Sequence, residues 1–203
     1  MKKIFLSVLA VVALSLQAQA QTPDFKLGAK AGVNFANLSN AEFDGKTAFH
    51  VGVVGEFFIN DKFSVQPEIL YSSQGAKLKN NLYEFNESFE SKITLDYIHI
   101  PIMAKYNLWE GLNVQFGPQV GFLTKAEEDF TNTLAGVTTT GVQDIKNDAN
   151  KVDFGLNFGL GYELGMGVFF DARYNLGLTN VNKKNELFDY SNRAIQLSVG
   201  YKF

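Results

Sequence analysis

Eight segments of the chain alternate large apolar residues with small or polar residues. The clearest alternation runs through residues 152–162, where valine, phenylalanine, leucine and tyrosine occupy every second position and glycine, asparagine and aspartate fill the rest. Side chains on a β-strand point alternately to opposite faces, so each segment predicts a strand with one bulky apolar face and one small, polar face.

The connectors between these segments are alternately long and short. The predicted strands are residues 25–35, 48–59, 63–77, 93–106, 112–124, 152–164, 168–178 and 194–203. Each reaches the roughly 9–11 residues that a tilted strand needs to cross a membrane. The short connectors, 60–61, 108–111 and 165–167, contain Asn, Asp or Gly, which favour the positive φ angles of hairpin turns. The longest connector runs from Lys125 to Lys151. Outer-membrane barrels have this plan, with short turns in the periplasm and long loops outside.

The N-terminus has the pattern of a secretory signal peptide. Lys2 and Lys3 precede an apolar stretch, and Ala18 and Ala20 supply the small residues of a cleavage site. The alternative is a membrane anchor, but the stretch is shorter than the roughly 20 apolar residues that a spanning helix needs. We therefore expect a signal peptide over residues 1–20 and one barrel domain over residues 21–203.

Composition narrows the class of protein further. The chain has no cysteine, and its formal net charge of −3 becomes −5 once Lys2 and Lys3 are removed. No basic stripe occurs, so nucleic acid is not an expected partner. No second apolar run is long enough for a transmembrane helix, which leaves a closed β-barrel as the way to span a membrane.

Alternation alone does not say which face of the sheet points outward. A secreted soluble barrel such as a lipocalin has the same period with the opposite polarity. The polar face is rich in small residues, which suit the narrow interior of an eight-stranded barrel and not a water-exposed surface. These residues are Gly28, Gly32, Gly52, Gly117, Gly121, Gly155, Gly159 and Gly161. We therefore predict an all-β, eight-stranded antiparallel up-and-down transmembrane β-barrel.

Aromatic residues near the strand ends fit this prediction, whereas three prolines do not. Eight aromatic residues lie where girdles at the two membrane interfaces are expected: Phe25, Phe35, Phe57, Tyr71, Tyr106, Phe122, Tyr162 and Tyr201. Pro67, Pro101 and Pro118 lie inside predicted strands, where each removes a ladder hydrogen bond. We expect them at bulges or at strand ends near the membrane surface.

Several short motifs together resemble the porin-type outer-membrane β-barrel family that includes PorT-like proteins. They are Ala-Gln-Ala-Gln at 18–21, Lys-Ala-Gly-Val-Asn at 30–34, Pro-Glu-Ile-Leu-Tyr at 67–71, Tyr-Ile-His-Ile-Pro at 97–101, Lys-Tyr at 105–106, Gly-Pro at 117–118 and Val-Gly-Tyr-Lys-Phe at 199–203. The resemblance covers the whole mature chain and implies a small barrel in the outer membrane. It also implies that Phe203 is the C-terminal aromatic read by the barrel-assembly machinery; a simple girdle aromatic is the alternative.

Charged residues on the polar face are the candidate site. The set that we single out is Lys30, Glu56, Glu68, Lys105, Asp171 and Arg173. Charges buried in a lumen must pair, since an unpaired one costs several kcal/mol. We expect a structural ion-pair network, with a gate for a narrow pore as the alternative. Lys105 is expected nearer the periplasmic end and the others near mid-barrel, with Glu68 and Arg173 in one network.

We find no pattern typical of an enzyme, a cofactor site or a metal centre. Only two histidines occur, His50 and His99, and no nucleophile, metal cluster or phosphate loop accompanies them. The acidic run 127–129 is a weak candidate for a divalent cation and more typical of solvated loop charge. The aromatic residues within 80–90 suit either a partner contact or packing of the loop on itself.

These features predict an integral, non-enzymatic protein of a Gram-negative outer membrane. Its role would be structural, adhesive or in assembly, exercised through extracellular loops that bind a protein or glycan, because loops on rigid scaffolds commonly carry function. Outer-membrane lipid and the barrel-assembly machinery are the other expected partners. A narrow small-solute channel is the alternative function, and a secreted ligand-binding barrel is the third.

Overall fold

The computed structural model describes residues 25–39, 44–82, 87–134, 136–183 and 190–203. They form nine strands: β1 (Phe25–Leu38), β2 (Asp44–Phe58), β3 (Phe63–Leu82), β4 (Glu87–Trp109), β5 (Leu112–Leu134), β6 (Val137–Asp144), β7 (Val152–Glu163), β8 (Val168–Gly177) and β9 (Asn192–Lys202). Within these residues, no helix has the length and apolarity needed to cross a membrane. The predicted signal peptide lies outside the described residues.

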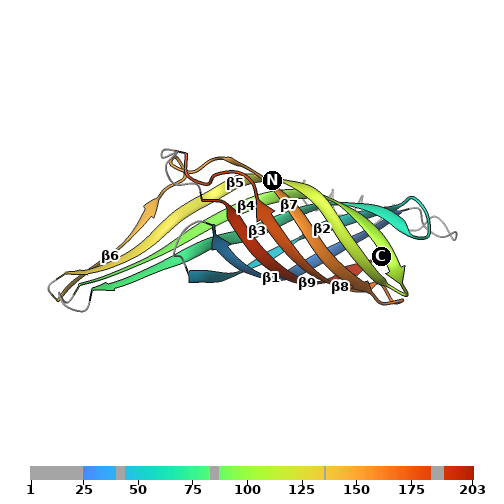
Figure 1. Cartoon of the computed structure of the whole chain (residues 1–203), viewed down its shortest axis with the longest axis horizontal. Helices are drawn as coiled ribbons and strands as arrows, with labels where there is room; N and C mark the ends of the chain where they lie inside the picture. Colours follow the sequence, from blue (N-terminus) through green and yellow to red (C-terminus); the bar gives the residue numbers. More distant parts are fainter. Residues whose placement is uncertain (1–24, 40–43, 83–86, 135, 184–189) are drawn as a thin grey trace, which may run out of the picture.

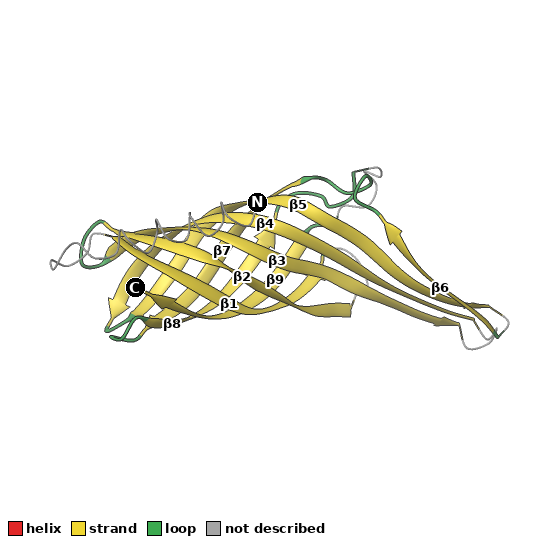
Figure 2. Cartoon of the chain, turned by 180° about the vertical axis from the view of Figure 1, so that it is seen from behind, coloured by secondary structure: helices red, strands yellow, loops and turns green. Residues whose placement is uncertain are grey.

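Eight of the strands close into a ring. Their order is β4-β3-β2-β1-β9-β8-β7-β5, and pairing of β4 with β5 closes the circle. Every pairing is antiparallel between neighbours of the ring. Figures 1 and 2 show the tilted strands of this barrel and, at one end, a tapering extension in which β6 lies. The predicted eight-stranded barrel is confirmed, and the ninth strand is an addition to it.

The bulky face of the sheet points outward. Phe154, Phe158 and Tyr174 keep 57%, 45% and 40% of their surface exposed, whereas the alternate positions are buried. A soluble barrel would turn these rings into a common core, because apolar area is removed from water wherever the fold permits. The outward rings leave lipid as their solvent, and the girdle aromatics are exposed or half-buried as expected.

Glycines on the inner face make room for larger side chains in a narrow lumen. A Cβ atom built on Gly121 would lie 2.4 Å from the imidazole of His99, and one on Gly159 would lie 2.7 Å from the side chain of Arg173. Carbon atoms do not approach so closely without displacing one another. The small inward residues are therefore required by the long polar side chains beside them.

The short turns use their residues in two different ways. Gly111 and Gly167 both have φ +87°, the left-handed conformation that glycine adopts without strain. Asn60 acts through its side chain: its Oδ1 accepts hydrogen bonds from the backbone N–H groups of Lys62 and Phe63. The described chain ends lie beside these turns, where the Phe203 N–H donates to the Leu27 carbonyl at 2.7 Å.

The three prolines interrupt the ladder without shifting it. The β2–β3 pairing skips the position of Pro67, the β3–β4 pairing that of Pro101, and the β4–β5 pairing that of Pro118, and each resumes in the same register. The expectation of bulges or strand ends is therefore wrong. Each proline lacks a donor toward one neighbour only, and the second neighbour still pairs with it.

The largest departure from the predicted strands is at the end with the long connectors. β3 ends at Leu82, β4 begins at Glu87 and β5 runs to Leu134, so each exceeds its predicted length. Part of the predicted 125–151 loop is strand, because β6 folds back along β5 from Leu134↔Val137 to Glu127↔Asp144. Outside the membrane both faces of the sheet are accessible to water, so apolar and polar residues no longer alternate along the strands. Backbone pairing continues there without this pattern.

Candidate functional site: the barrel lumen and the extracellular sheet

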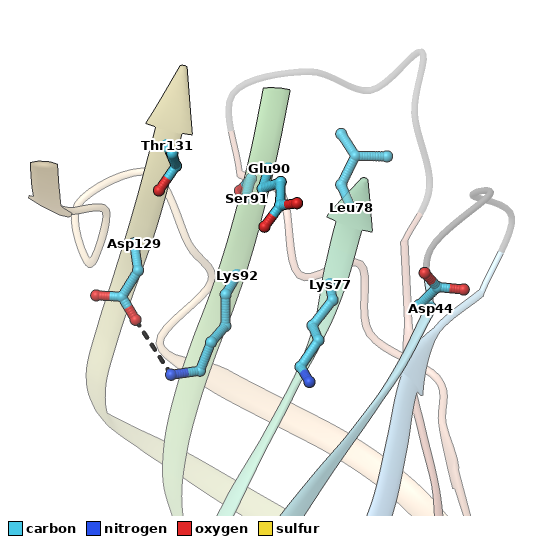
Figure 3. Close-up of a pocket in the computed structure, with 8 residues that line it drawn as sticks. All are labelled: Asp44, Lys77, Leu78, Glu90, Ser91, Lys92, Asp129 and Thr131. Carbon is cyan, nitrogen blue, oxygen red and sulfur yellow. Dashed lines mark hydrogen bonds and ion pairs between the residues drawn. The ribbon is translucent and has the colours of Figure 1, made fainter. Parts of the chain in front are cut away.

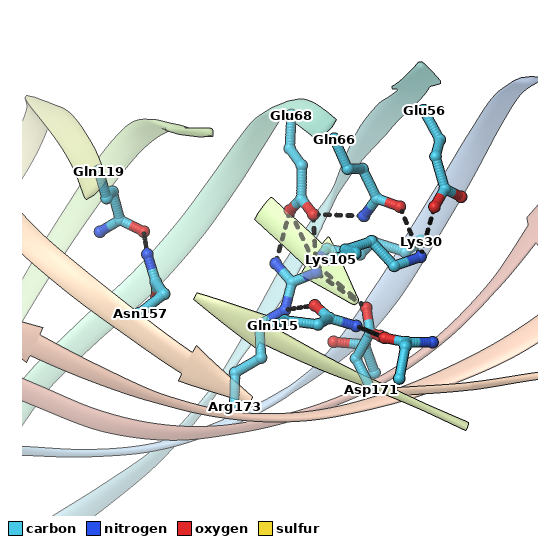
Figure 4. A network of polar contacts seen from close by, with 12 residues as sticks. Lys30, Glu56, Gln66, Glu68, Lys105, Gln115, Gln119, Asn157, Asp171 and Arg173 are labelled. Atoms are coloured by element: carbon cyan, nitrogen blue, oxygen red, sulfur yellow. Dashed lines mark hydrogen bonds and ion pairs between the residues drawn. The ribbon is translucent and has the colours of Figure 1, made fainter. Parts of the chain in front are cut away.

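Four charged side chains meet in the middle of the lumen (Figure 4). The Arg173 guanidinium lies 2.8 Å from Glu68 and 3.1 Å from Asp171, and the Lys30 ammonium lies 2.7 Å from Glu68. All four are at most 5% exposed. β3 and β8, which carry Glu68 and Arg173, are opposite each other in the ring, so this ion pair crosses the whole barrel.

A second group of ion pairs lies nearer the periplasmic end. Glu56 pairs with Lys105 at 2.9 Å and with Lys202, and Lys202 also reaches Glu163 at 2.6 Å. Lys26 completes the group by pairing with Glu163 at 3.0 Å. These residues come from β1, β2, β4, β7 and β9, so their contacts run across the lumen and not along one strand.

Amide side chains join the two groups into one network. Gln66 donates to Glu68 at 2.7 Å and accepts from Lys105 at 3.3 Å. Gln115 donates to Asp171 at 2.7 Å and accepts from the Arg173 Nε at 2.9 Å. Such a network suits a narrow lumen, because each of its buried charges lies within 4 Å of an opposite charge that offsets its desolvation.

The structure brings the six predicted charged residues together with one correction, and it adds Lys26, Glu163 and Lys202 to them. Lys30, Glu68, Asp171 and Arg173 form the middle group, as their strand positions suggested. Glu56, expected at mid-barrel, lies instead with Lys105 in the periplasmic group because strand tilt offsets equal sequence positions in height. Lys202 was missed, although its place between the outward Tyr201 and Phe203 marks it as inward. Whether the network is structural or gating remains a prediction.

Between the ion-pair network and the outer mouth, the lumen is lined by polar side chains, and not all of their hydrogen-bonding groups have partners. His50 contacts Asn34 at 2.7 Å and Ser198 at 2.8 Å through its two ring nitrogens. His99 stacks on Tyr97 with ring centroids 5.1 Å apart, and neither of its ring nitrogens has a hydrogen-bond partner among the described residues. Tight pairing is thus concentrated in the middle and periplasmic parts of the lumen.

An apolar cluster covers the outer mouth of the lumen. Its buried members are Leu38, Ala76, Leu95, Tyr97, Leu123, Ala126 and Ala149. Ile145, Val181 and Tyr190, from connectors outside the ring, pack against it. A hollow of about 200 Å³ lies within this cluster and is lined mostly by aliphatic side chains. The mouth is therefore closed by apolar packing and the lumen below by ion pairs.

Beyond the lipid-facing belt, β3, β4, β5 and β6 continue as a sheet, here called the extracellular sheet. A row of charges crosses it and the end of β2: Asp44 pairs in register with Lys77, Lys77 with Lys92, and Lys92 with Asp129. The Lys92 ammonium lies 3.3 Å from the Asp129 carboxylate. Figure 3 shows these four residues lining a polar groove of about 380 Å³.

Each carboxylate of the acidic run 127–129 has its own partner. Glu127 pairs with Lys125 at 2.7 Å, Glu128 accepts from Ser91 at 2.5 Å, and Asp129 pairs with Lys92. Successive residues of a strand point to opposite faces, so the three do not converge on one point. The hydrogen bond from Lys125 to Glu127 raises the pKa of that ammonium above its usual value.

Lys46 lies at the base of the extracellular sheet, just outside the lipid-facing belt. Its ammonium donates to the Thr94 hydroxyl at 2.8 Å and to the Gln74 carbonyl at 3.2 Å. No carboxylate among the described residues forms an ion pair with it. Burial, followed by the nearby charge of Lys92, lowers the pKa of Lys46 to about 8.

Comparison with known proteins gives a family and a set of similar folds. Residues 17–183, most of the chain, match the family described as outer membrane protein beta-barrel domain. No curated protein matches the sequence. The predicted resemblance to outer-membrane barrels is thereby confirmed at the level of this family.

Three solved structures with a similar fold are distant in sequence. Neisserial surface protein A is 15% identical, with a TM-score of 0.49, and the match covers 89% of this chain and 98% of that one. Ail, the attachment invasion locus protein of Yersinia pestis, is 10% identical, with a TM-score of 0.45 and coverage of 88% and 97%. The β-barrel domain of Pseudomonas aeruginosa OprF is 12% identical, with a TM-score of 0.40 and coverage of 90% and 100%. On the match over residues 17–183, the chain belongs to the outer membrane protein beta-barrel domain family and is an integral protein of the outer membrane.

Proposed function

We propose that the protein is a non-enzymatic membrane anchor for the extracellular sheet, and that this sheet makes adhesive or structural contacts outside the cell. The observation that carries the proposal is the continuation of β3, β4 and β5 past the lipid-facing belt, with β6 added to their edge. A barrel needs only strands long enough to span the bilayer. The additional paired length has no role in spanning and is continuous with the strands of the barrel below.

The exposed apolar residues of this sheet support a contact role. Leu134, Val137 and Val142 are each more than half exposed, although they lie outside the lipid-facing belt. Exposed apolar side chains that lipid does not cover are available to a protein partner. The polar groove on the same sheet adds charges of both signs beside them.

The lumen supports a structural role and not a channel. The Glu68–Arg173 pair crosses the barrel, the Glu56–Lys105 group lies below it, and the apolar cluster lies above. An eight-stranded barrel has an interior that side chains fill. Among small barrels of the family, we propose a PorT-like relationship from the motifs at 67–71 and 97–101.

Removal of the tip of the sheet tests the proposal. The Ile145 N–H donates to the Ala126 carbonyl at 3.0 Å, so residues 127–144 can be replaced by a two-residue turn without separating the strands of the ring. We expect cells with this variant to lose attachment to surfaces or to other cells. The variant should keep its outer-membrane fractionation and its heat-modifiable migration on gels. Attachment equal to wild type, in the presence of an intact barrel, would refute the contact role.

A further inference from the structure

The open edge of β6 is the part of the extracellular sheet least protected against pairing with another strand. Among the described strands, β6 is hydrogen-bonded only to β5 and stands at the end of the sheet order. Figures 1 and 2 show it at the margin of the extension, away from the ring. A row of backbone N–H and C=O groups along such an edge is a template for a further strand.

The sequence of β6 lacks the usual protections of an edge. Residues 137–143 read Val-Thr-Thr-Thr-Gly-Val-Gln, with no charge and no proline, and five of the seven are β-branched. Val137 and Val142 are 69% and 67% exposed. Natural edges are commonly blocked by lysine, proline, a bulge or a covering segment. β6 instead has the composition of an inner strand, which favours pairing.

The packing of β5 against β6 keeps this edge extended. The Phe130 ring covers Gly141: a Cβ atom built on that glycine would lie 2.5 Å from the ring. Phe130 and Gly141 are also register partners. An aromatic ring over a cross-strand glycine compensates for the missing side chain, so the strand is stabilised from one side while the other stays open.

We propose that two copies of the protein pair through their β6 edges, antiparallel, and that the two copies belong to opposing membranes. This deepens the proposed function, on which it rests, by naming the partner. When the uncharged stretch 137–143 pairs with itself, Val137 lies opposite Gln143 and Thr138 opposite Val142. Thr140 then lies opposite Thr140 of the second copy. No like charges meet, and Thr–Thr and β-branched pairs are favourable on a sheet.

Membrane geometry determines that the pairing is between cells. Copies in one membrane are related by rotation about its normal, which preserves the component of each strand along that normal, so two β6 strands that rise from the same membrane do not meet antiparallel. Antiparallel pairing reverses the strand and, with it, the barrel axis. The two barrels therefore face each other, and seven paired residues give a contact roughly 23 Å long at about 3.3 Å per residue.

Cysteine cross-linking tests both the partner and the register. The chain has no cysteine of its own. Thr140→Cys proteins with two different affinity tags are produced in separate cell populations with truncated surface polysaccharide, which are then mixed and oxidised. We expect a disulfide-linked dimer carrying both tags only after mixing. Thr131→Cys, on the interior strand β5, is the matched control and should give none.

Charge exchange provides a second, independent readout. Cells with Thr140→Lys, or with Thr140→Glu, should each aggregate roughly tenfold less than wild type, because like charges would lie directly opposite. Mixed Lys and Glu populations should aggregate again. Heat-modifiable migration establishes that the charge variants fold, and a membrane-impermeant thiol label establishes that the cysteine variants are displayed.

Three results would overturn the inference. They are the absence of a two-tag dimer after mixing, its formation by two tagged copies within one cell, and equal cross-linking through Thr131→Cys. If the 127–144 replacement abolishes attachment but Thr140→Cys gives no dimer, the contact role stands and the partner is another molecule. If the replacement has no effect either, both ideas fail.

Discussion

Arg173 is a buried cation in the middle of the lumen that pairs with two carboxylates. It pairs with Glu68 across the barrel and with Asp171 on its own strand. Lys30 also contacts both carboxylates, at 2.7 Å and 3.7 Å. The middle group is therefore neutral as a set of four, and it remains neutral only if a cation and an anion are removed together.

We expect Arg173→Met to destabilise the barrel by about 3–5 kcal/mol, since two buried carboxylates are then left to share the single Lys30 ammonium. The measurement is urea unfolding of the protein refolded in lipid vesicles. The double variant Glu68→Met/Arg173→Met keeps the Lys30–Asp171 pair and should recover much of the loss. A double variant as unstable as the sum of the two single variants would contradict a shared network.

Lys46 should give stability a distinctive dependence on pH. Its pKa of about 8 in the folded protein lies below the ordinary lysine pKa of 10.5. Below pH 8 both states bind the proton, and the folded protein bears the full cost of the buried charge. Between pH 8 and 10.5 the unfolded chain binds more protons, so the free energy of unfolding rises with pH in this window.

The difference between wild type and Lys46→Met isolates this contribution from other lysines. We expect the rise between pH 8 and 10.5 to be smaller in the variant, as measured by urea unfolding at a series of pH values. Identical pH profiles for the two proteins would show that the Lys46 ammonium is not perturbed by folding.

At the scale of elements, the β5–β6 hairpin is a unit distinct from the ring. β6 is paired with β5 alone among the described strands, and all but one of its residues are exposed. Units with few buried apolar contacts open independently of the rest of a protein. Two side-chain contacts support β6 on β5: Phe130 lies against Gly141, and the hydroxyls of Thr133 and Thr138 are 3.1 Å apart.

We therefore expect Phe130→Ala to accelerate amide hydrogen exchange in residues 137–144 while leaving the ring strands unchanged. Thr131→Ala, on the other face of β5, is the control and should have little effect. The idea of an independent unit would fail if Phe130→Ala left the amide exchange rates of β6 unchanged. It would also fail if the substitution raised the exchange rates of the ring strands together with those of β6.

The whole molecule is a barrel whose lumen is obstructed in two ways, by ion pairs and by apolar packing. The middle of the lumen is crossed by Glu68–Arg173, and the outer mouth is covered by the cluster around Leu95 and Tyr97. We expect the wild-type protein to show no conductance steps in planar bilayers, with a wide-lumen porin as the positive control. Reproducible ohmic steps would favour the narrow-channel alternative.

Alternation made the ring predictable because lipid and lumen impose opposite demands on successive residues. Each strand of the ring was located from this period, as were the outward Phe154 and the inward Lys30. Glycines such as Gly121 and Gly159 indicated from the sequence alone which face of the sheet lines the narrow lumen, and in the structure they lie against long inward side chains. The inward position of Lys202 could have been predicted in the same way, since it lies between two outward residues of an alternating strand.

Only the tertiary structure decided which charges meet and how far the sheet extends. Glu56 and Lys105 come together because strand tilt and register set their heights in the barrel. Tilt and register depend on how the strands pair, so the sequence of a single strand does not reveal them. The upper parts of β4 and β5, and all of β6, have water on both faces, so no period of two distinguishes them. The sequence by itself determined the membrane-spanning barrel, because burial in lipid constrains every second residue. The sheet above it is held by backbone pairing, which constrains side chains weakly and became visible only in the fold.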